Sequence, residues 1–211
     1  MEQCDLLFIS FFLVVEILNV SGDSLMYERF HFSRYAMYRS IEHWAYDNRC
    51  VGKGKTVGGG SPICELWPQV EFETTNYPNV NVHSLPWEKE SLDILVADQV
   101  LEHVKYPWKA ASEMCRVLKK EGILVCTTCF LQRWHPPDVY FGFHPSGLRI
   151  LFDPYLSDMQ VGGWGNREAN DKINFDDKWR HRKVEGDRRM EQLVNENDPK
   201  APFATWVMGR K

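Results

Sequence analysis

The sequence lacks a strong excess of charge of either sign, and this argues against binding to nucleic acid. Its 211 residues include 25 lysines and arginines and 29 acidic residues, a formal net charge of −4. A nucleic-acid-binding domain usually carries a basic surface that attracts phosphates. We also find no internal repeat and no low-complexity segment. A hydrophobic content of 44% and a charged content of 26% are typical of an ordinary globular protein.

Cysteine is too sparse and too scattered for a disulfide framework. The six cysteines stand at positions 4, 50, 64, 115, 126 and 129. Cys126 and Cys129 form a C-x-x-C pair, but no second pair accompanies them, so a zinc ribbon is unsupported. A redox pair normally begins a helix, whereas this pair ends a predicted strand. We therefore interpret both as small residues near a strand end and predict no metal site.

A long apolar run is also missing. Residues 6–18, LLFISFFLVVEIL, are shorter than the roughly 20 residues of a transmembrane helix, and Glu16 interrupts them. Three interpretations of residues 1–22 stay open: a signal or membrane anchor, a helix packed on the domain, or an extension that is not native to the fold. Residues 23–211 are expected to form a single domain. We expect a cytoplasmic protein, or a secreted or membrane-attached one if residues 1–22 act as a signal or anchor.

The sequence does contain a strand–helix–strand unit between residues 92 and 128. Residues 92–97 are almost all apolar, as in a strand covered on both faces of a parallel sheet. Pro107 suits the first position of a helix. Lys119 and Lys120 suit the last turn of that helix, and Gly122 suits its left-handed cap. Residues 123–128 predict a second buried strand, and such units are nearly always right-handed crossovers between parallel strands.

This unit resembles the segment between the fourth and fifth strands of class I S-adenosylmethionine-dependent methyltransferases of the small-molecule type. The resemblance covers most of residues 51–211 and rests on Leu85-Pro86-Trp87, Asp93, Val100-Leu101-Glu102-His103-Val104, Arg116-Val117-Leu118-Lys119 and Gly122. It implies an α/β, Rossmann-like fold with a mostly parallel central sheet, helices on both faces and an antiparallel last strand. It also implies S-adenosylmethionine as the cofactor and a small molecule as the methyl acceptor.

The pattern outside this unit predicts the remaining elements. They are helices over residues 27–46 and from Pro145, strands over 70–74, near 80–85 and over 202–210, a turn-rich loop at 162–167, and a charged solvated helix or mobile loop at 172–189.

The glycine-rich residues 50–62 do not match a nucleotide-binding loop. Gly54-Lys55-Thr56 lacks the earlier glycine of a P-loop, because position 49 is arginine. A dinucleotide-binding loop is excluded as well, because Ile63 stands at its third glycine position. Gly58, Gly59 and Gly60 instead resemble the family's first glycine loop, where the backbone comes close to the cofactor.

The strand before these glycines departs from the family pattern. The family has a carboxylate two positions before the first glycine, and this chain has Thr56 there. Residues 51–55 also predict a poor buried strand, as if about three residues of strand, the acid included, were absent. The missing carboxylate would weaken the grip on the ammonium group of the cofactor.

The resemblance implies further cofactor contacts. Asn76 stands where the family's second strand ends in a ribose-binding acid, and its amide oxygen accepts hydrogen bonds without the strength of a charge. Asn81 lies near the adenine position, and Leu85 completes this group. Asp98 and Gln99 end a predicted strand at the sheet edge where open α/β sheets bind ligands.

The candidate catalytic residues are Glu102 and His103, at the entry to the predicted helix. His103 suits a general base on a substrate hydroxyl, because histidine titrates near neutrality. Alternatively, both residues only fix the loop through hydrogen bonds. An aromatic loop follows residue 129, and the family closes this segment over the acceptor. The substrate-pocket candidates are Trp134, His135, Tyr140 and His144.

Two functions follow from this pattern. The first is transfer of a methyl group from S-adenosylmethionine to a small-molecule acceptor by in-line displacement. The second is a catalytically weakened or inactive relative that serves as an interaction or structural domain, as Thr56 and Asn76 suggest.

Overall fold

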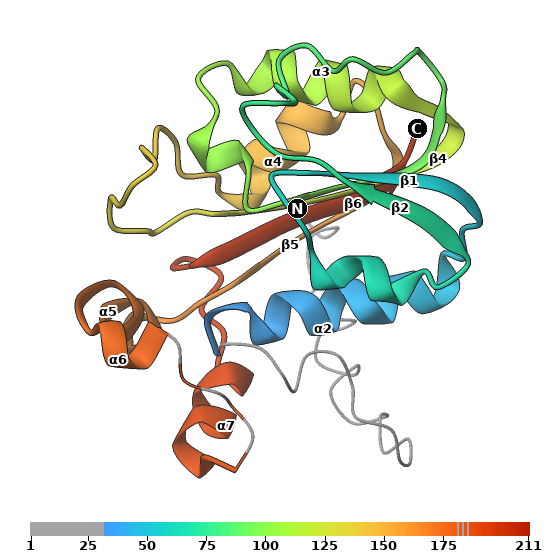
Figure 1. Cartoon of the computed structure of the whole chain (residues 1–211). Helices are drawn as coiled ribbons and strands as arrows, with labels where there is room; N and C mark the ends of the chain where they lie inside the picture. Colours follow the sequence, from blue (N-terminus) through green and yellow to red (C-terminus); the bar gives the residue numbers. More distant parts are fainter. Residues whose placement is uncertain (1–31, 181, 183, 185) are drawn as a thin grey trace, which may run out of the picture.

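The described residues form a sheet with the strand order β2-β1-β3-β4-β6-β5 (Figure 1). The computed structural model describes residues 32–211 except residues 181, 183 and 185. Expectations for residues 1–22, and for the start of the helix expected at 27–46, lie outside the described residues. The strands are β1 (Gly52–Val57), β2 (Val70–Thr74), β3 (Leu92–Asp98), β4 (Leu118–Cys129), β5 (Ser157–Trp164) and β6 (Ala204–Arg210).

Strand directions agree with the fold class that the sequence predicts. β1 pairs in parallel with both β2 and β3, and β3 pairs in parallel with β4. β6 runs antiparallel to β4 and to β5, as expected for the closing strand. The mostly parallel, Rossmann-like sheet with an antiparallel last strand is therefore confirmed.

Helices cover both faces of this sheet (Figure 1). α2 (Phe32–Asp47) packs on one face, with the helices α5 (Arg167–Phe175) and α7 (Arg188–Asn195) in the same hydrophobic cluster. α3 (Pro107–Val117) and α4 (Pro145–Phe152) pack on the other face. The short α6 (Asp177–Arg180) follows α5. Side chains of β3 alternate between the two layers, because successive residues of a strand point to opposite faces.

The strand–helix–strand unit forms as predicted, with one difference at the end of the helix. α3 begins at Pro107 and ends at Val117, so Lys119 and Lys120 lie in β4 and not in the last helical turn. Lys119 Nζ instead lies 2.9 Å from both carboxylate oxygens of Asp93. The left-handed residue is Glu121, with φ 62°, and not Gly122. Pairing of Leu118 with Leu92 draws this segment into the sheet.

Residues 51–55 predict a poor buried strand, yet Gly52–Val57 forms β1 between β2 and β3 in the sheet. A Cβ atom at Gly54 would lie 2.6 Å from the Phe72 ring and 2.7 Å from a Val70 methyl group. The neighbouring strand therefore supplies the apolar atoms that the glycine lacks. Lys55 pairs with the carboxylate of Glu73 at the partly exposed edge of this strand pair.

Two other elements differ from the sequence prediction. Residues 80–85 form turns with an isolated bridge between Asn81 and Ser84, and not a third strand. Gly162 lies within β5 and not in a loop, because the Trp206 indole of β6 fills the space where its side chain would be. The predicted elements at Pro145, at residues 70–74 and at residues 202–210 are present.

Two connections contain short 3-10 turns. η2 (Pro62–Leu66) links β1 to β2, and η3 (Leu101–His103) follows β3. In the charged region, α5, α6 and α7 account for most of the described residues. Among the described residues, no helix combines the length and the apolar character that crossing a bilayer requires.

Candidate functional site

A tight glycine turn lies at the carboxyl end of β1. Gly58 and Gly59 have φ angles of 88° and 111°, which favour glycine over residues with a side chain. A Cβ atom at Gly58 would lie 2.5 Å from Cγ2 of Val100, which follows β3. The Gly59 N–H donates to the Thr75 carbonyl oxygen at 2.9 Å, just beyond β2. The turn therefore lies against the carboxyl ends of the two neighbouring parallel strands, where open α/β sheets bind ligands.

The Asp98 carboxylate joins three elements beside this turn. Its Oδ2 accepts hydrogen bonds from the Tyr38 hydroxyl of α2 at 2.9 Å and from the Ser61 hydroxyl at 2.8 Å. Its Oδ1 accepts one from the Thr127 hydroxyl of β4 at 2.5 Å. A carboxylate has about four lone-pair positions, so this one keeps capacity for another donor.

Two residues of α2 place charge and a hydroxyl over the same sheet edge. The Arg34 guanidinium donates to the Tyr38 hydroxyl at 3.3 Å. Burial alone would lower the pKa of Arg34, but Tyr38, Asp98 and Glu102 more than offset burial and raise it. Burial and the nearby Asp98 raise the pKa of Tyr38, so its hydroxyl remains a donor at neutral pH.

Gln99 holds a strained backbone at the end of β3. Its φ of 56° is uncommon for a residue with a side chain. The Gln99 N–H donates to the carbonyl oxygen of Thr127 at 3.1 Å, and its side-chain amide donates to the Thr127 hydroxyl at 3.1 Å. The side chain of Gln99 is thus directed along β4 and fixed there.

Glu102 is buried, and its carboxylate is held by a hydrogen bond from a residue of β4. Its side chain is 1% exposed, and Oε2 accepts a hydrogen bond from the Thr128 hydroxyl at 2.7 Å. Burial raises the pKa of the Glu102 carboxyl, although Thr128, His103 and Arg34 act in the opposite direction. This environment fits the loop-fixing interpretation of Glu102.

His103 faces the aromatic loop and not the core. Its Nδ1 lies 2.9 Å from the Asp138 carbonyl oxygen, so this nitrogen carries a proton and Nε2 is the one available to accept. Its Nε2 lies 4.0 Å from Oε1 of Glu102. The His103 and His135 rings meet edge to face, with centroids 5.6 Å apart.

The four substrate-pocket candidates occupy different positions around this loop. The Tyr140 N–H donates to the Glu102 carbonyl oxygen at 2.7 Å, which brings Tyr140 and His135 to the edge of the site. Trp134 is 61% exposed and donates to Asp138 Oδ1 at 3.2 Å. His144 accepts from the Ser146 N–H at 3.3 Å and thereby caps α4.

The remaining cofactor candidates do not converge on Asp98 through any contact that we observe. Asn76 and Asn81 are exposed in the loop after β2, where Asn81 Oδ1 accepts from the His83 N–H at 3.0 Å. Gly60 is exposed, and a Cβ atom added there would lie 4.0 Å from Cγ2 of Thr74. The Leu85 side chain is buried in the layer of α3.

The sequence reasoning missed three residues that surround Asp98: Tyr38, Ser61 and Thr127. Tyr38 carried a detectable signal, because it is a polar residue one position after Met37 on the buried face of α2. Ser61 and Thr127 gave no such signal. Thr56 is 1% exposed, and its hydroxyl has no partner among the described groups.

The two cysteines of the C-x-x-C pair are buried in β4. The pKa of the Cys126 thiol is raised, mainly by burial. This disfavours the thiolate that redox or metal chemistry needs. Across the part of the chain that the structure describes, no group of three His, Cys, Asp or Glu side chains is placed to hold a metal ion.

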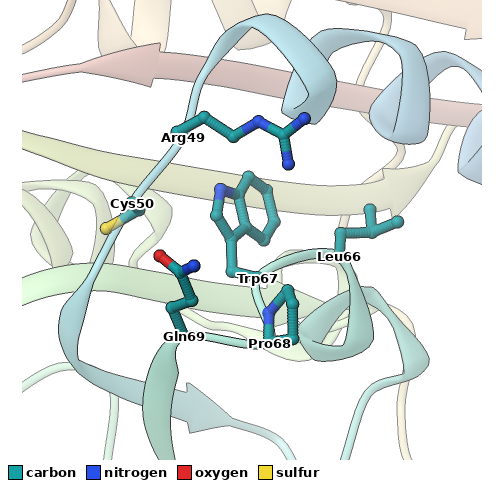
Figure 2. Close-up of a pocket in the computed structure, with 6 residues that line it drawn as sticks. All are labelled: Arg49, Cys50, Leu66, Trp67, Pro68 and Gln69. Atoms are coloured by element: carbon teal, nitrogen blue, oxygen red, sulfur yellow. The ribbon is translucent and has the colours of Figure 1, made fainter.

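Two hollows lie away from the glycine turn. One has a volume of about 250 Å³ beside the amino ends of β1 and β2, at the opposite edge of the sheet. Figure 2 shows the Trp67 indole standing in it between the side chains of Arg49 and Pro68. The second has a volume of about 370 Å³ and lies where β4 ends, against the end of α5.

Sequence comparison detects a family in the middle of the chain. Residues 65–126 match the family model of a methyltransferase domain. An uncharacterized methyltransferase from Mycobacterium sp. (strain KMS) is 32% identical over 96 residues, which cover 45% of this chain and 36% of the relative. The chain thus matches about a third of the length of that relative.

Structural comparison extends the likeness to most of the chain. The YcgJ protein of Bacillus subtilis has a TM-score of 0.51 at 14% identity, covering 82% of this chain and 98% of that chain. Phosphoethanolamine N-methyltransferase 2 of Haemonchus contortus, in complex with phosphomonomethylethanolamine and S-adenosylhomocysteine, has a TM-score of 0.52 at 12% identity. This match covers 83% of this chain and 52% of that chain. The chain thus has the fold of these solved structures, and its central segment, residues 65–126, is similar to a methyltransferase domain.

Proposed function

We propose that the protein transfers a methyl group from S-adenosylmethionine to a small-molecule acceptor by in-line displacement. The observation that carries this proposal is the glycine turn at residues 58–60, which lies against Val100 at the carboxyl ends of parallel strands. The matched methyltransferase segment ends at residue 126, one residue before the Thr127 that binds Asp98. The fold likeness to an S-adenosylhomocysteine complex supports the same cofactor.

The residues around the turn fit this cofactor, but the carboxylate stands at a different position from that in the family. The positive φ angles of Gly58 and Gly59 leave the backbone open to close approach. Thr56 offers no charge for an ammonium group, and its buried hydroxyl faces no carboxylate partner. The half-buried Asp98 supplies a carboxylate nearby, oriented by Tyr38 and Ser61. We assign to Asp98 the ammonium-binding role that the carboxylate missing at position 56 has in the family.

The other residues orient and shield the reactants. When bound, S-adenosylmethionine supplies an electrophilic methyl group on sulfur. Gln99 fixes the carboxyl end of β3, and Asn76 accepts hydrogen bonds from the ribose hydroxyls of the cofactor. His103 takes a proton from the acceptor at Nε2, because Nδ1 is committed to the Asp138 carbonyl oxygen.

The aromatic loop limits access of water to the acceptor. His135 and Tyr140 are held near residues 102–103 by ring contact and by a backbone hydrogen bond. Trp134 is exposed at the rim, and His144 anchors the far end of the loop on α4. Positioning donor and nucleophile within reach lowers the barrier to such a displacement.

A second candidate function is a catalytically weakened relative that acts as an interaction or structural domain. Thr56 and Asn76 favour it, because both replace carboxylates that the family uses on its cofactor. Asn76 is exposed and makes no contact with Asp98 that we observe, which also favours a catalytically weakened relative.

Calorimetric titration with S-adenosylhomocysteine separates the two functions. Micromolar binding supports the enzyme, and no heat at millimolar ligand supports the inactive relative. The Asp98→Asn variant should bind at least about tenfold more weakly, because a charged hydrogen bond to the ammonium group is lost. Asp153→Asn is the matched control, because Asp153 is exposed at the end of α4. Equal affinities of the two variants would contradict the role of Asp98.

A further inference from the structure

Arg34 of α2 is a half-buried cation beside the carboxyl end of β3. Its Nη1 donates to the Tyr38 hydroxyl at 3.3 Å. Tyr38 supplies this hydrogen bond, whereas Asp98 and Glu102 act on the guanidinium through their charge. A guanidinium has five N–H donors, and the bond to Tyr38 uses one of them. Within the described residues, Arg34 thus keeps donors for a ligand.

The Asp98 carboxylate and the glycine turn border the same space. A Cβ atom at Gly58 would lie 3.9 Å from the Asp98 carbonyl oxygen. Ser61, which follows the turn, and Tyr38 both donate to Asp98 Oδ2, at 2.8 Å and 2.9 Å. Since Tyr38 in turn accepts from Arg34, these contacts connect the turn, the carboxylate and α2. A ligand that enters at the glycine turn therefore meets a carboxylate and a guanidinium at one end.

The Tyr38 hydroxyl lies between the two charges and limits their separation. Arg34 Nη1 and Asp98 Oδ2 can be no further apart than the 3.3 Å and 2.9 Å of these two bonds combined. In an α-amino acid, standard bond lengths place the ammonium nitrogen roughly 3 Å from a carboxylate oxygen. With charged hydrogen bonds of about 2.8 Å at each end, such a group can bridge the two side chains.

The charges of the two side chains complement those of a zwitterion. An ammonium group is attracted to Asp98, and a carboxylate is attracted to Arg34. A ligand with only one of these groups would pair with one side chain and leave the other charge without a partner as water is displaced, which is costly. This part of the site therefore favours an amino-acid group over a simple amine or a simple acid.

We propose that Arg34 binds the carboxylate of the amino-acid end of the cofactor while Asp98 binds its ammonium group. The ligand class is then a nucleoside that carries a zwitterionic α-amino acid. This inference rests on the proposed function, from which the ammonium-binding role of Asp98 is taken. The competing explanation is that Arg34 only orients Tyr38 and touches no ligand.

The test compares two nucleosides by calorimetric titration of the full chain. S-adenosylhomocysteine carries both charged groups, and its decarboxylated analogue keeps the ammonium group alone. Arg34→Gln should weaken S-adenosylhomocysteine at least about tenfold and leave the decarboxylated analogue within about twofold, because only the first has the carboxylate. Asp98→Asn should weaken both nucleosides, since both carry the ammonium group.

Arg39→Gln is the matched control. Arg39 is a second half-buried arginine of α2, but five residues place it about 140° around the helix from Arg34. It should change the affinity of neither nucleoside. Circular dichroism verifies that each variant folds. If Arg34→Gln does not fold, Arg34→Lys serves in its place, because it keeps the charge and loses the paired donors, and its smaller loss should again be confined to S-adenosylhomocysteine.

The outcomes separate failure of this inference from failure of the proposed function. No binding of S-adenosylhomocysteine by the wild type at millimolar concentration overturns the proposed function and this inference with it. Binding by the wild type, with an equal loss for both nucleosides in Arg34→Gln or with no loss for either, overturns this inference alone. A loss confined to S-adenosylhomocysteine supports both.

Discussion

Replacing individual glycines with alanine tests whether the glycine turn needs both its backbone conformation and its contact with β3. In Gly58→Ala the backbone keeps a φ of 88°, which is unfavourable for alanine. The new Cβ atom would lie 2.5 Å from Cγ2 of Val100. The left-handed backbone costs roughly 1–2 kcal/mol, and overpacking adds about 1–3 kcal/mol. We therefore expect the free energy of unfolding to fall by about 2–5 kcal/mol.

Substitutions at two other glycines separate the cost of backbone strain from the cost of overpacking. Gly59 has a φ of 111° but no atom within 4 Å of its virtual Cβ, so Gly59→Ala should cost only the backbone strain of about 1–2 kcal/mol. Gly147 lies in α4 with open space around it, so Gly147→Ala should stabilise the protein by about 0.5–1 kcal/mol.

Urea denaturation measures the three variants, and a double-mutant cycle isolates the contact. Val100→Ala, combined with Gly58→Ala, should recover the overpacking cost and leave the backbone cost, because the clash involves the Val100 methyl group. If Gly58→Ala were as stable as Gly147→Ala, the close approach of the turn to β3 would be refuted.

Three further predictions concern single groups near the turn. Thr56→Val should raise the free energy of unfolding by about 1 kcal/mol in urea denaturation, because it removes a buried hydroxyl that has no partner. Tyr38→Phe should lower it by about 1–2 kcal/mol through loss of the bond to Asp98; an unchanged value would mean that this bond is dispensable. Burial raises the pKa of Glu102 above its ordinary 4.5, so the folded state binds more protons than the unfolded state as pH rises from 4.5. Stability should therefore fall over that window in the wild type and less in Glu102→Gln, and parallel pH profiles would contradict this.

The sequence predicts the centre of the fold because its information is local there. β3 is buried on both faces, so its apolar run alone indicates a covered parallel strand. Pro107 marks the start of α3 for an equally local reason. The end of α3 was mispredicted, because pairing of Leu118 with Leu92 overrides the helix-ending signal of the lysines.

Elements completed by distant residues could not be predicted. Gly54 makes an adequate strand residue only because Phe72 from β2 covers it, and Gly162 only because Trp206 from β6 does. The same holds at the candidate site, where the partners of Asp98 come from α2, from the turn and from β4. Local patterns name Asp98 as a strand-end residue, but its hydrogen-bond partners depend on the tertiary fold.

The place of β6 in the sheet has a consequence for synthesis of the protein. β6 follows every other strand along the chain, yet it lies between β4 and β5. While the ribosome is still making it, β4 presents an unpaired edge, and β5 has no neighbour in the sheet. Open strand edges of this kind pair readily with other chains. A nascent chain that stalls before residue 204 would therefore be prone to aggregate, and chaperones would be needed most during that interval.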